Sequence, residues 1–338
     1  MKEYFTFDDV CILPKYSDIA SRKDVDTSQV IKGVTIPFPL ISAPMDTITG
    51  STMASTISNF GGIGLLHRFW SIEDNLKAYQ EAISNTDNPE LVGCSFGLND
   101  RERVDTFYKN GCRIFCLDIA YSYTERAGKE LYYISNKYPD IILISGSVVG
   151  KEATEYVCGK GAWLARIGIS PGGLCSTSQK TGITMPQLSA IIDSAKADYH
   201  IIADGGVKTP ADFCKCLAGG ASLVMLGSML SATLETPGDI IVKDGKSYKR
   251  VRGMASQSVN EELHGSMPDW KTSEGVDVEV PFKGSVIDIL KDINGGLRSS
   301  MTYVGARTLQ EYYSKTEFAK VSHSSVIQSR PHILDSRM

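Results

Sequence analysis

The sequence predicts a (β/α)8 TIM barrel, in which eight parallel strands alternate with helices. The chain has 338 residues, a length that suits one barrel domain. Short apolar runs recur along it, and most are continuous rather than alternating, as expected for strands buried on both faces of a parallel sheet. Helix-period segments lie between several of these runs. A doubly wound open sheet produces a similar pattern, but eight alternations favour the closed barrel.

The eight predicted strands are Pro39–Ala43, Gly62–Leu66, Leu91–Cys94, Ile114–Asp118, Ile141–Ser145, Trp163–Ile167, His200–Ala203 and Leu223–Leu226. The helix-period segments between them are Asp74–Ser84, Asp100–Lys109, Lys151–Gly159, Pro186–Ala195 and Pro210–Ala218. Thr209 precedes Pro210 and is expected to cap that helix.

Two stretches depart from the alternation. Residues 241–284 are polar and contain Lys243-Asp244-Gly245, which is typical of a hairpin turn. A long excursion of this kind inside a barrel is usually a functional flap or a disordered insertion. The segment from about 315 to 338 is rich in serine, and we expect it to be mobile or held by another subunit. No further domain is predicted.

Composition excludes several classes of protein. The formal net charge of -4 offers no basic field for nonspecific binding of a nucleic acid. No apolar run approaches the roughly 20 residues of a membrane helix. The N-terminal residues lack the apolar core of a secretory signal, so we expect a cytoplasmic protein. None of the eight cysteines has zinc-site spacing, and all except Cys175 are expected to be reduced core thiols.

The strongest functional signal is the loop Gly168–Gly182, which follows a predicted strand. Its glycines permit close approach to a ligand, and its amides and carbonyls could bind an anion or a monovalent cation. Cys175 lies at its apex among hydroxyl side chains. Core packing explains such a cysteine poorly, although an incidental loop thiol remains the alternative.

Three further motifs point to a nucleotide. Asp204-Gly205-Gly206 follows one strand and Gly227-Ser228 the next, resembling the phosphate site that many barrels build at their last strands. In the excursion, Glu274 offers a carboxylate for a purine edge or a proton, although most lone glutamates on flaps are merely solvated. Gly295–Gly305 has more glycines and hydroxyls than a simple helix start needs.

Taken in order, these motifs resemble the IMP dehydrogenase and GMP reductase family over nearly the whole chain. The matching segments are residues 5–17, Ser42–Thr49, Gly61–His67, the cysteine loop, the glycine turns, Arg252–Met254, residues 273–275 and Gly295–Gly305. The resemblance implies a (β/α)8 barrel, a homotetramer and a purine nucleoside monophosphate as substrate, with no nucleic acid or membrane partner.

GMP reductase is the branch that the sequence resembles more. Residues 70–96 run directly between strands, leaving no room for the paired regulatory domains usual in the dehydrogenase. The dehydrogenase's Arg-Tyr pair, which activates the hydrolytic water, has no counterpart between Arg252 and Gly284. Residues 180–191 and 271–284 look like the reductase, whereas Ser42–Thr47, Arg252–Met254 and Met225–Ser228 lean toward the dehydrogenase.

The resemblance implies a mechanism in which Cys175 attacks C2 of the guanine base of GMP or a related nucleotide such as dGMP. Thr177 and Glu274 would relay the proton that helps ammonia leave, and the thioimidate left on Cys175 would be reduced by NADPH, or by NADH, to yield IMP. The substrate would be bound by Met45, Gly173, Asp204, Gly205, Gly206, Gly227, Ser228, Met254, Ala255, Ser256, Lys271, Ser273 and Gly275.

The cofactor region implied by the resemblance comprises Arg68, Asp118, Ile119, Ala120, Ser147, Ser299, Ser300, Met301 and Thr302, the last four reaching a neighbouring subunit. Carbonyls of Ser170, Gly172 and Cys175 could hold a potassium ion.

Departures from the family lie around this site. Tyr121-Ser122 replaces Asn-Gly, Ser147 replaces Asn, Gly173 replaces Ser, and Lys271 stands where the reductase has Arg. Two alternatives therefore stay open: an IMP dehydrogenase without regulatory domains, which would use NAD to form XMP, and a purine-nucleotide-binding homologue that has lost catalysis.

Overall fold

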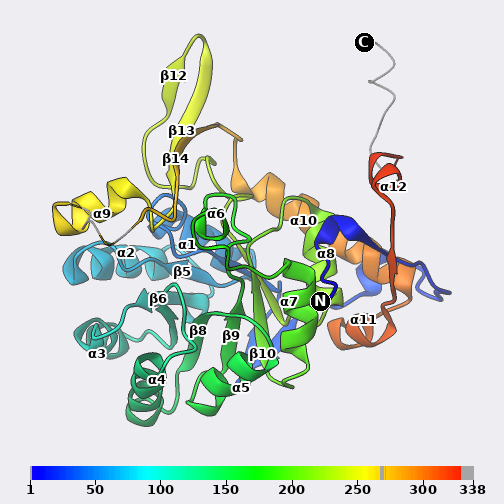
Figure 1. Ribbon diagram of the computed structural model, residues 1–338, viewed down its shortest axis with the longest axis horizontal. Coiled ribbons are helices and arrows are strands. Elements are labelled where there is room, and N and C mark those ends of the chain that lie inside the picture. The colour runs from blue at the N-terminus through cyan, green and yellow to red at the C-terminus, as the bar shows by residue number, and fades with distance from the viewer. Residues whose placement is uncertain (1, 267–269, 271, 329–338) are drawn as a thin grey trace.

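A parallel eight-stranded barrel forms the body of the molecule in this computed structural model, which describes residues 2–266, 270 and 272–328 (Figure 1). The strands lie in the order β4-β11-β10-β9-β8-β7-β6-β5. The ring closes because Ile63, just before β5, bridges to Ile41 of β4, with the Ser42 amide donating to the Ile63 carbonyl at 3.0 Å. The predicted barrel is confirmed. Its strands are β4 (Leu40–Ser42), β5 (Gly64–Leu66), β6 (Val92–Phe96), β7 (Ile114–Asp118), β8 (Ile142–Val148), β9 (Leu164–Ile167), β10 (His200–Asp204) and β11 (Leu223–Leu226).

Helices surround the barrel and follow the predicted periodic segments closely. The Thr209 side chain accepts a hydrogen bond from the Asp212 amide and completes a capping box, so the predicted cap is confirmed. The helices are α1 (Ser51–Asn59), α2 (Ile72–Ser84), α3 (Arg101–Lys109), α4 (Glu125–Lys137), α5 (Lys151–Gly159), α6 (Thr177–Thr181), α7 (Gln187–Ala195), α8 (Pro210–Ala218), α10 (Val286–Val304) and α11 (Leu309–Lys315), with short 3-10 turns at Phe7–Asp9, Arg22–Asp24 and Pro89–Leu91.

Two apolar cores hold the barrel together. One lies between strands and helices, and the other fills the barrel interior with side chains such as Ile41, Leu65 and Ile144. The hairpin of β2 (Gln29–Ile31) and β3 (Val34–Ile36) adds Ile31 and Ile36 to the interior core. Lys32 at its turn donates to the carbonyl of Ile141, just before β8. The hairpin therefore covers the end of the barrel interior where the strands begin, and the opposite end is the one where barrels carry their sites.

The described residues of the excursion 241–284 form a flap of three strands and one helix. Strands β12 (Ile241–Lys243), β13 (Lys246–Arg252) and β14 (Asp277–Pro281) make an antiparallel sheet, and α9 (Gln257–His264) follows β13. Asp244 and Gly245 have φ angles of 50° and 72°, as the predicted tight hairpin turn requires. The β12–β13 hairpin projects away from the barrel (Figure 1).

The C-terminal segment predicted to be mobile begins with regular structure. Strand β15 (Phe318–Lys320) pairs with β1 (Val10–Ile12) of the same chain, and α12 (His323–Gln328) follows it. This part of the segment is thus held by the chain's own N-terminal strand. Residues 329–338 lie outside the described part.

The remaining sequence predictions concern cysteines and membranes. None of the eight thiols is in a disulfide; six are buried, Cys11 is half-buried and Cys175 is exposed. Reduced core thiols are therefore confirmed at six positions. Among the described helices, none combines the length and apolar character needed to cross a membrane.

His67, directly after β5, is a buried histidine whose environment disfavours its protonated form. Its side chain is fully buried, and its Nδ1 accepts a hydrogen bond from the Phe69 amide at 3.1 Å. Burial lowers the pKa of His67 to about 3, and the nearby positive charges of Arg103 and Arg252 add to this effect. The folded protein therefore keeps His67 neutral, whereas the unfolded chain protonates it with an ordinary pKa of about 6.5.

We expect this histidine to make the protein less stable as pH falls. Its contribution is fully present above about pH 6.5 and is lost progressively toward pH 3, because only the unfolded state takes up the proton in that window. Replacement by Asn, which can still accept from Phe69, should make the slope of unfolding free energy between pH 6.5 and 5 shallower by up to about 1.4 kcal/mol per pH unit. Urea unfolding at several pH values measures this, and equal slopes in both proteins would contradict it.

Candidate functional site

A cavity of about 520 Å³ opens at the carboxyl ends of the barrel strands, beneath the flap. Its walls come from the carboxyl ends of seven strands or the loops that follow them, and from the part of the flap between β13 and β14. Most residues predicted for the site line this one cavity. They are Met45, Arg68, Asp118, Ile119, Ala120, Ser147, Ser170, Gly172, Gly173, Cys175, Thr177, Asp204, Gly205, Gly206, Gly227, Ser228, Met254, Ala255, Glu274 and Gly275.

Two predicted substrate residues support the walls instead of lining them. Ser256 is buried, and its hydroxyl accepts from the Val259 amide at the start of α9. Ser273 donates its hydroxyl to the carbonyl of Gly275 at 3.0 Å. Both hydroxyls therefore shape the loops that bring Ala255 and Glu274 to the cavity. Lys271 lies outside the described residues.

The predicted cofactor residues 299–302 are not part of this cavity, because they lie in the last turns of α10. Met301 is fully buried in the core of its own chain, and the predicted contact of residues 299–302 with a cofactor at a neighbouring subunit stays a prediction. Ser300 is hydrogen-bonded to the hydroxyl of Tyr312 in α11 at 2.6 Å. Ser299 and Thr302 each donate to a carbonyl one turn earlier in the helix. The glycines and hydroxyls noted in Gly295–Gly305 thus lie in the second half of α10 and its C-cap.

The cysteine loop is held open by pairing with the flap. The Ser176 amide donates to the Glu274 carbonyl at 2.9 Å, and the Val276 amide donates to the Leu174 carbonyl at 3.1 Å. Cys175 and Gly275 thus face each other as an antiparallel bridge. This pairing joins segments almost a hundred residues apart in sequence, and it places Cys175 at the cavity with an exposed side chain.

Three functional side chains form a continuous hydrogen-bonded chain. Cys175 Sγ lies 3.1 Å from Thr177 Oγ1, and this hydroxyl donates to Glu274 Oε2 at 2.7 Å. Such a chain can pass a proton between the carboxylate and a group bound beside the sulfur. The spacing of a thiol nucleophile from a hydroxyl that is itself oriented by a carboxylate matches the geometry of covalent catalysis.

The turn Asp204-Gly205-Gly206 packs directly under the cysteine loop. Gly205 has a φ of +89°, and a Cβ there would lie 2.8 Å from Pro171 and 3.0 Å from the Gly172 amide nitrogen. Any side chain would therefore push the cysteine loop away. The same turn faces Gly227-Ser228 across the cavity end, so two sets of backbone amides can meet one anion.

Arg166 is a site residue that the sequence prediction missed. It lies on β9, buried in the cavity floor, with Nη2 2.8 Å from Asp118 Oδ1 and Nη1 3.6 Å from Asp204 Oδ2. Burial disfavours its cation, but the two carboxylates outweigh this and raise the pKa of Arg166. Burial raises the pKa of Asp204, although Arg166 opposes the shift. An arginine within an otherwise apolar strand was the available signal.

Removing the Arg166 charge should destabilise the protein strongly. Arg166→Met leaves Asp118 and Asp204 as neighbouring carboxylates in the cavity floor, and breaking a buried pair of this kind typically costs roughly 3 to 5 kcal/mol. Arg166→Lys keeps the charge but loses the forked geometry, so its loss should be smaller. Chemical denaturation of both variants tests this order, and a Met variant as stable as wild type would refute it.

Lys283 and Gln187 were also missed, and both act behind the cavity wall. The Lys283 ammonium donates to the Ser228 carbonyl at 2.7 Å, fixing the turn after β11. The buried Gln187 amide donates to the carbonyls of Ile167 and Asp204, both at 2.9 Å, and so joins the ends of β9 and β10. Both lie in segments that resemble the reductase, but the sequence assigned neither residue a role, because each acts on main-chain carbonyls brought together by folding.

The residues that differ from the family pattern lie at different places around the cavity. Gly173 faces Ser228, where a Cβ would sit at an ordinary 3.7 Å contact. Ser147 lines the cavity, and its main chain exchanges hydrogen bonds with Ile119 and Ser122. Tyr121 is exposed and packs edge-on with Tyr123. The substitutions at Gly173 and Ser147 thus change the cavity surface itself.

Barrel and site together define an α/β barrel protein with an exposed thiol and two glycine-containing turns in one strand-end cavity. The family model described as "IMP dehydrogenase / GMP reductase domain" matches residues 4–332. Mouse GMP reductase 2 is 35% identical over 336 residues, covering 94% of each chain. A GMP reductase of Buchnera aphidicola is 36% identical over 327 residues, with 94% coverage of each chain. The inosine-5'-monophosphate dehydrogenase of Borreliella burgdorferi is 32% identical over 392 aligned positions, covering 98% of this chain and 97% of its own.

The chain therefore belongs to the IMP dehydrogenase and GMP reductase family, whose members named here are oxidoreductases. Similarity alone does not separate the two branches, because relatives of both kinds match nearly the whole chain at comparable identity.

Proposed function

We propose that this protein is a GMP reductase, which converts GMP or a close guanine nucleotide such as dGMP to IMP and ammonia with NADPH. The observation that carries the proposal is the hydrogen-bonded chain from Cys175 through Thr177 to Glu274. A nucleophile and a proton relay aimed at the same point suit the displacement of an amino group from a ring carbon. The names of the relatives support the same substrate class.

In the first step, the Cys175 thiolate attacks C2 of the guanine ring and a C–S bond forms. The electron pair moves onto the ring, and the exocyclic amine takes a proton from the Thr177–Glu274 relay. The C2–N bond then breaks and ammonia leaves, so that C2 is held as a thioimidate on Cys175. Ribose would be held by Asp204, and the phosphate by the amides of the Gly205-Gly206 and Gly227-Ser228 turns.

In the second step, C2 gains a hydride, the C–S bond breaks and Cys175 leaves as thiolate, giving the C2–H of IMP. A reduced nicotinamide cofactor, when bound, supplies that hydride. Arg68, Asp118 and Ser147 offer a guanidinium, a carboxylate and a hydroxyl in the same cavity, a donor set that fits a carboxamide and a dinucleotide. The Arg68 Nε is oriented by the Asp118 carbonyl at 3.2 Å.

The proposal includes a potassium ion only as a structural ion, bound by carbonyl groups of the cysteine loop. Carbonyls of Ser170, Gly172 and Cys175 are oxygen donors, which suit a hard cation. The Gly172 carbonyl already accepts from the Cys175 amide at 3.0 Å and keeps one lone pair for an ion. A homotetramer, which the family resemblance supports, and a cytoplasmic location complete the proposal.

The dehydrogenase is the second candidate, favoured by the residues around Met45 and Met254. Its reaction must end with water hydrolysing the adduct on the cysteine, which needs a base that the reductase does without. Residues 253–284 contain neither arginine nor tyrosine, and Arg252 is engaged in ion pairs outside the cavity. The dehydrogenase's Arg-Tyr pair therefore has no counterpart in residues 253–284, which favours the reductase.

Turnover with a panel of purine nucleotides tests the assignment directly. GMP with NADPH should yield IMP by mass, with loss of the cofactor's absorbance, and Cys175→Ala should abolish it. Glu274→Gln should lower kcat by about 100- to 10,000-fold, as expected for loss of a proton relay. XMP formed from IMP and NAD would instead establish the dehydrogenase, and tight nucleotide binding without any turnover would establish a catalytically lost homologue.

Restoring the hydroxyl that relatives carry beside Cys175 should strengthen substrate binding. Gly173 has room for a Cβ 3.7 Å from Ser228 and does not adopt a positive φ, so Gly173→Ser should fold normally. One added hydrogen bond near the phosphate is worth about 1 kcal/mol, or roughly a fivefold lower KM for GMP. Gly173→Ala, which adds the carbon without the hydroxyl, is the control, and an equal effect of both variants would refute the role of the hydroxyl.

A further inference from the structure

Arg252 occupies the junction between the flap and the cavity. It is the last residue of β13, and the next residues, Gly253 to Ala255, line the cavity. Its register partner across the flap sheet is Asp277, three residues after Glu274. Both flap strands therefore reach the site within three residues of Arg252 or its partner. A shift at this junction would move the base-contacting loop and the relay carboxylate together.

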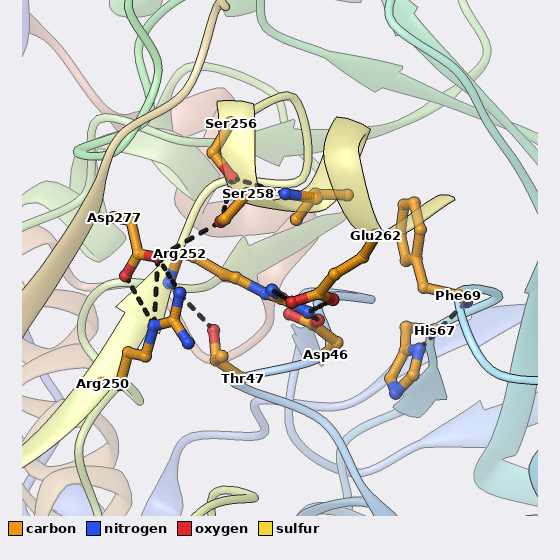
Figure 2. Close-up of polar contacts among 11 residues, drawn as sticks. Asp46, Thr47, His67, Phe69, Arg250, Arg252, Ser256, Ser258, Glu262 and Asp277 are labelled. Carbon is orange, nitrogen blue, oxygen red and sulfur yellow. Dashed lines mark hydrogen bonds and ion pairs between the residues drawn. The ribbon is translucent and has the colours of Figure 1, made fainter. Parts of the chain in front are cut away.

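The barrel holds Arg252 through both its main chain and its side chain (Figure 2). The Arg252 amide donates to Thr47 Oγ1 at 3.2 Å, and its Nε donates to Asp46 Oδ2 at 2.9 Å, with Nη2 reaching the same oxygen. From the other side, Glu262 of α9 accepts from Nη1 at 2.6 Å and Nη2 at 2.7 Å. The Arg252 side chain is 13% exposed and that of Asp46 only 8%.

The Asp46 carboxylate depends on Arg252 for its charge balance. Within the described part of the chain, its other oxygen, Oδ1, is buried with no hydrogen-bond partner, and so is Nε2 of His67. His67 stays neutral because of its burial and so cannot replace the cation. Buried carboxylates keep a paired cation in place strongly, since separating the two leaves an uncompensated charge. The Asp46–Arg252 contact is therefore a rigid attachment, unlike an exposed ion pair.

The attachment is continuous with the relay through main-chain hydrogen bonds. The Gly253 amide donates to the Val276 carbonyl at 2.9 Å, and the Glu274 amide donates to the Ala255 carbonyl at 3.1 Å. Asp46 itself follows Met45, which lines the cavity near Gly227. The loop that follows Arg252 is thus hydrogen-bonded on both sides of Glu274, the residue whose carboxylate orients Thr177.

Other charged pairs of the flap stay within the flap. Arg250 pairs with Asp277 across the flap sheet (Figure 2). Lys243 near the hairpin tip pairs with Glu279 at 2.6 Å. These pairs join flap strands to each other and do not contact the barrel. Lys243 therefore provides a matched control, because its pair is charged and lies on the same sheet but does not connect to the cavity.

We propose that Arg252 is a positioning residue for the relay: clamped between Asp46 and Glu262, it sets where Glu274 stands relative to Cys175 and Thr177. The effect expected on kcat rests on the proposed function, whereas the effect expected on the main-chain hydrogen bonds around Glu274 does not. Arg252 is not among the residues that line the cavity. Its effect passes through the loop 253–255.

The structural consequence is measured on the free protein by hydrogen exchange. In Arg252→Gln, the amides of Gly253, Glu274 and Val276 should exchange at least tenfold faster than in wild type, whereas Lys243→Ala should leave them unchanged. Unchanged exchange at these amides in a folded Arg252→Gln protein would overturn the proposal. This readout needs no substrate, so it holds whether or not GMP is turned over.

The kinetic consequence distinguishes positioning from mere stability. Asp46→Asn combined with Arg252→Gln removes both charges and should recover thermal stability lost in the single variant. It should still show kcat lowered by about 100-fold, as expected for a misplaced catalytic group, and Arg252→Lys should recover part of it. A double variant with both normal stability and normal kcat would overturn the proposal. Wild-type protein inactive on every purine nucleotide would reject the proposed function while leaving the exchange result to decide on Arg252.

Discussion

The pairing of the cysteine loop with the end of the flap is the interaction on which the site depends. Two main-chain hydrogen bonds, Ser176 to Glu274 and Val276 to Leu174, make a short antiparallel bridge across the cavity mouth. Without it, Cys175 would lie on a loop of small polar residues, with no carboxylate near Thr177. Because main-chain hydrogen bonds are directional, the bridge sets the distance between nucleophile and relay as well as their proximity.

Buried charges supply the second constraint. Arg166 joins Asp118 and Asp204 in the barrel floor, and Arg252 joins Asp46 to the flap helix. In a low-dielectric setting each carboxylate is costly alone, so each arginine ties together the elements that carry its partners. Arg166 connects Asp118, on the proposed cofactor side of the cavity, with Asp204, on the proposed ribose side. The Arg252–Asp46 pair connects the flap to the loop after β4, which forms part of the cavity wall. The site is therefore framed by two cations that need not take part in the chemistry.

Close backbone approach is the third constraint, and it explains the glycine motifs. Gly205 adopts a positive φ, and the cysteine loop packs closely against it. A Cβ on Gly205 would lie within 3.0 Å of that loop. Gly173 has no such requirement, because its φ is not positive and its space is open. The first glycine is required by the fold, whereas the second is a choice that changes the surface offered to a ligand. This difference separates the structural part of the family pattern from its variable part.

The sequence by itself determined the barrel, its eight strands and the segments that meet at their ends. Continuous apolar runs, helix periodicity and strand-end glycines are local properties, and Thr209 shows that even a helix cap can be read from them. The same local reasoning singled out Gly295–Gly305 for its glycines and hydroxyls, and the structure places this segment in the second half of α10 and its C-cap. It also passed over Arg166, Lys283 and Gln187. Only the tertiary structure decided the roles of these residues and of Arg252, since each depends on partners far away in sequence. Charge pairing and hydrogen bonding to a distant carbonyl leave no periodic trace, and they arise only once the chain has folded.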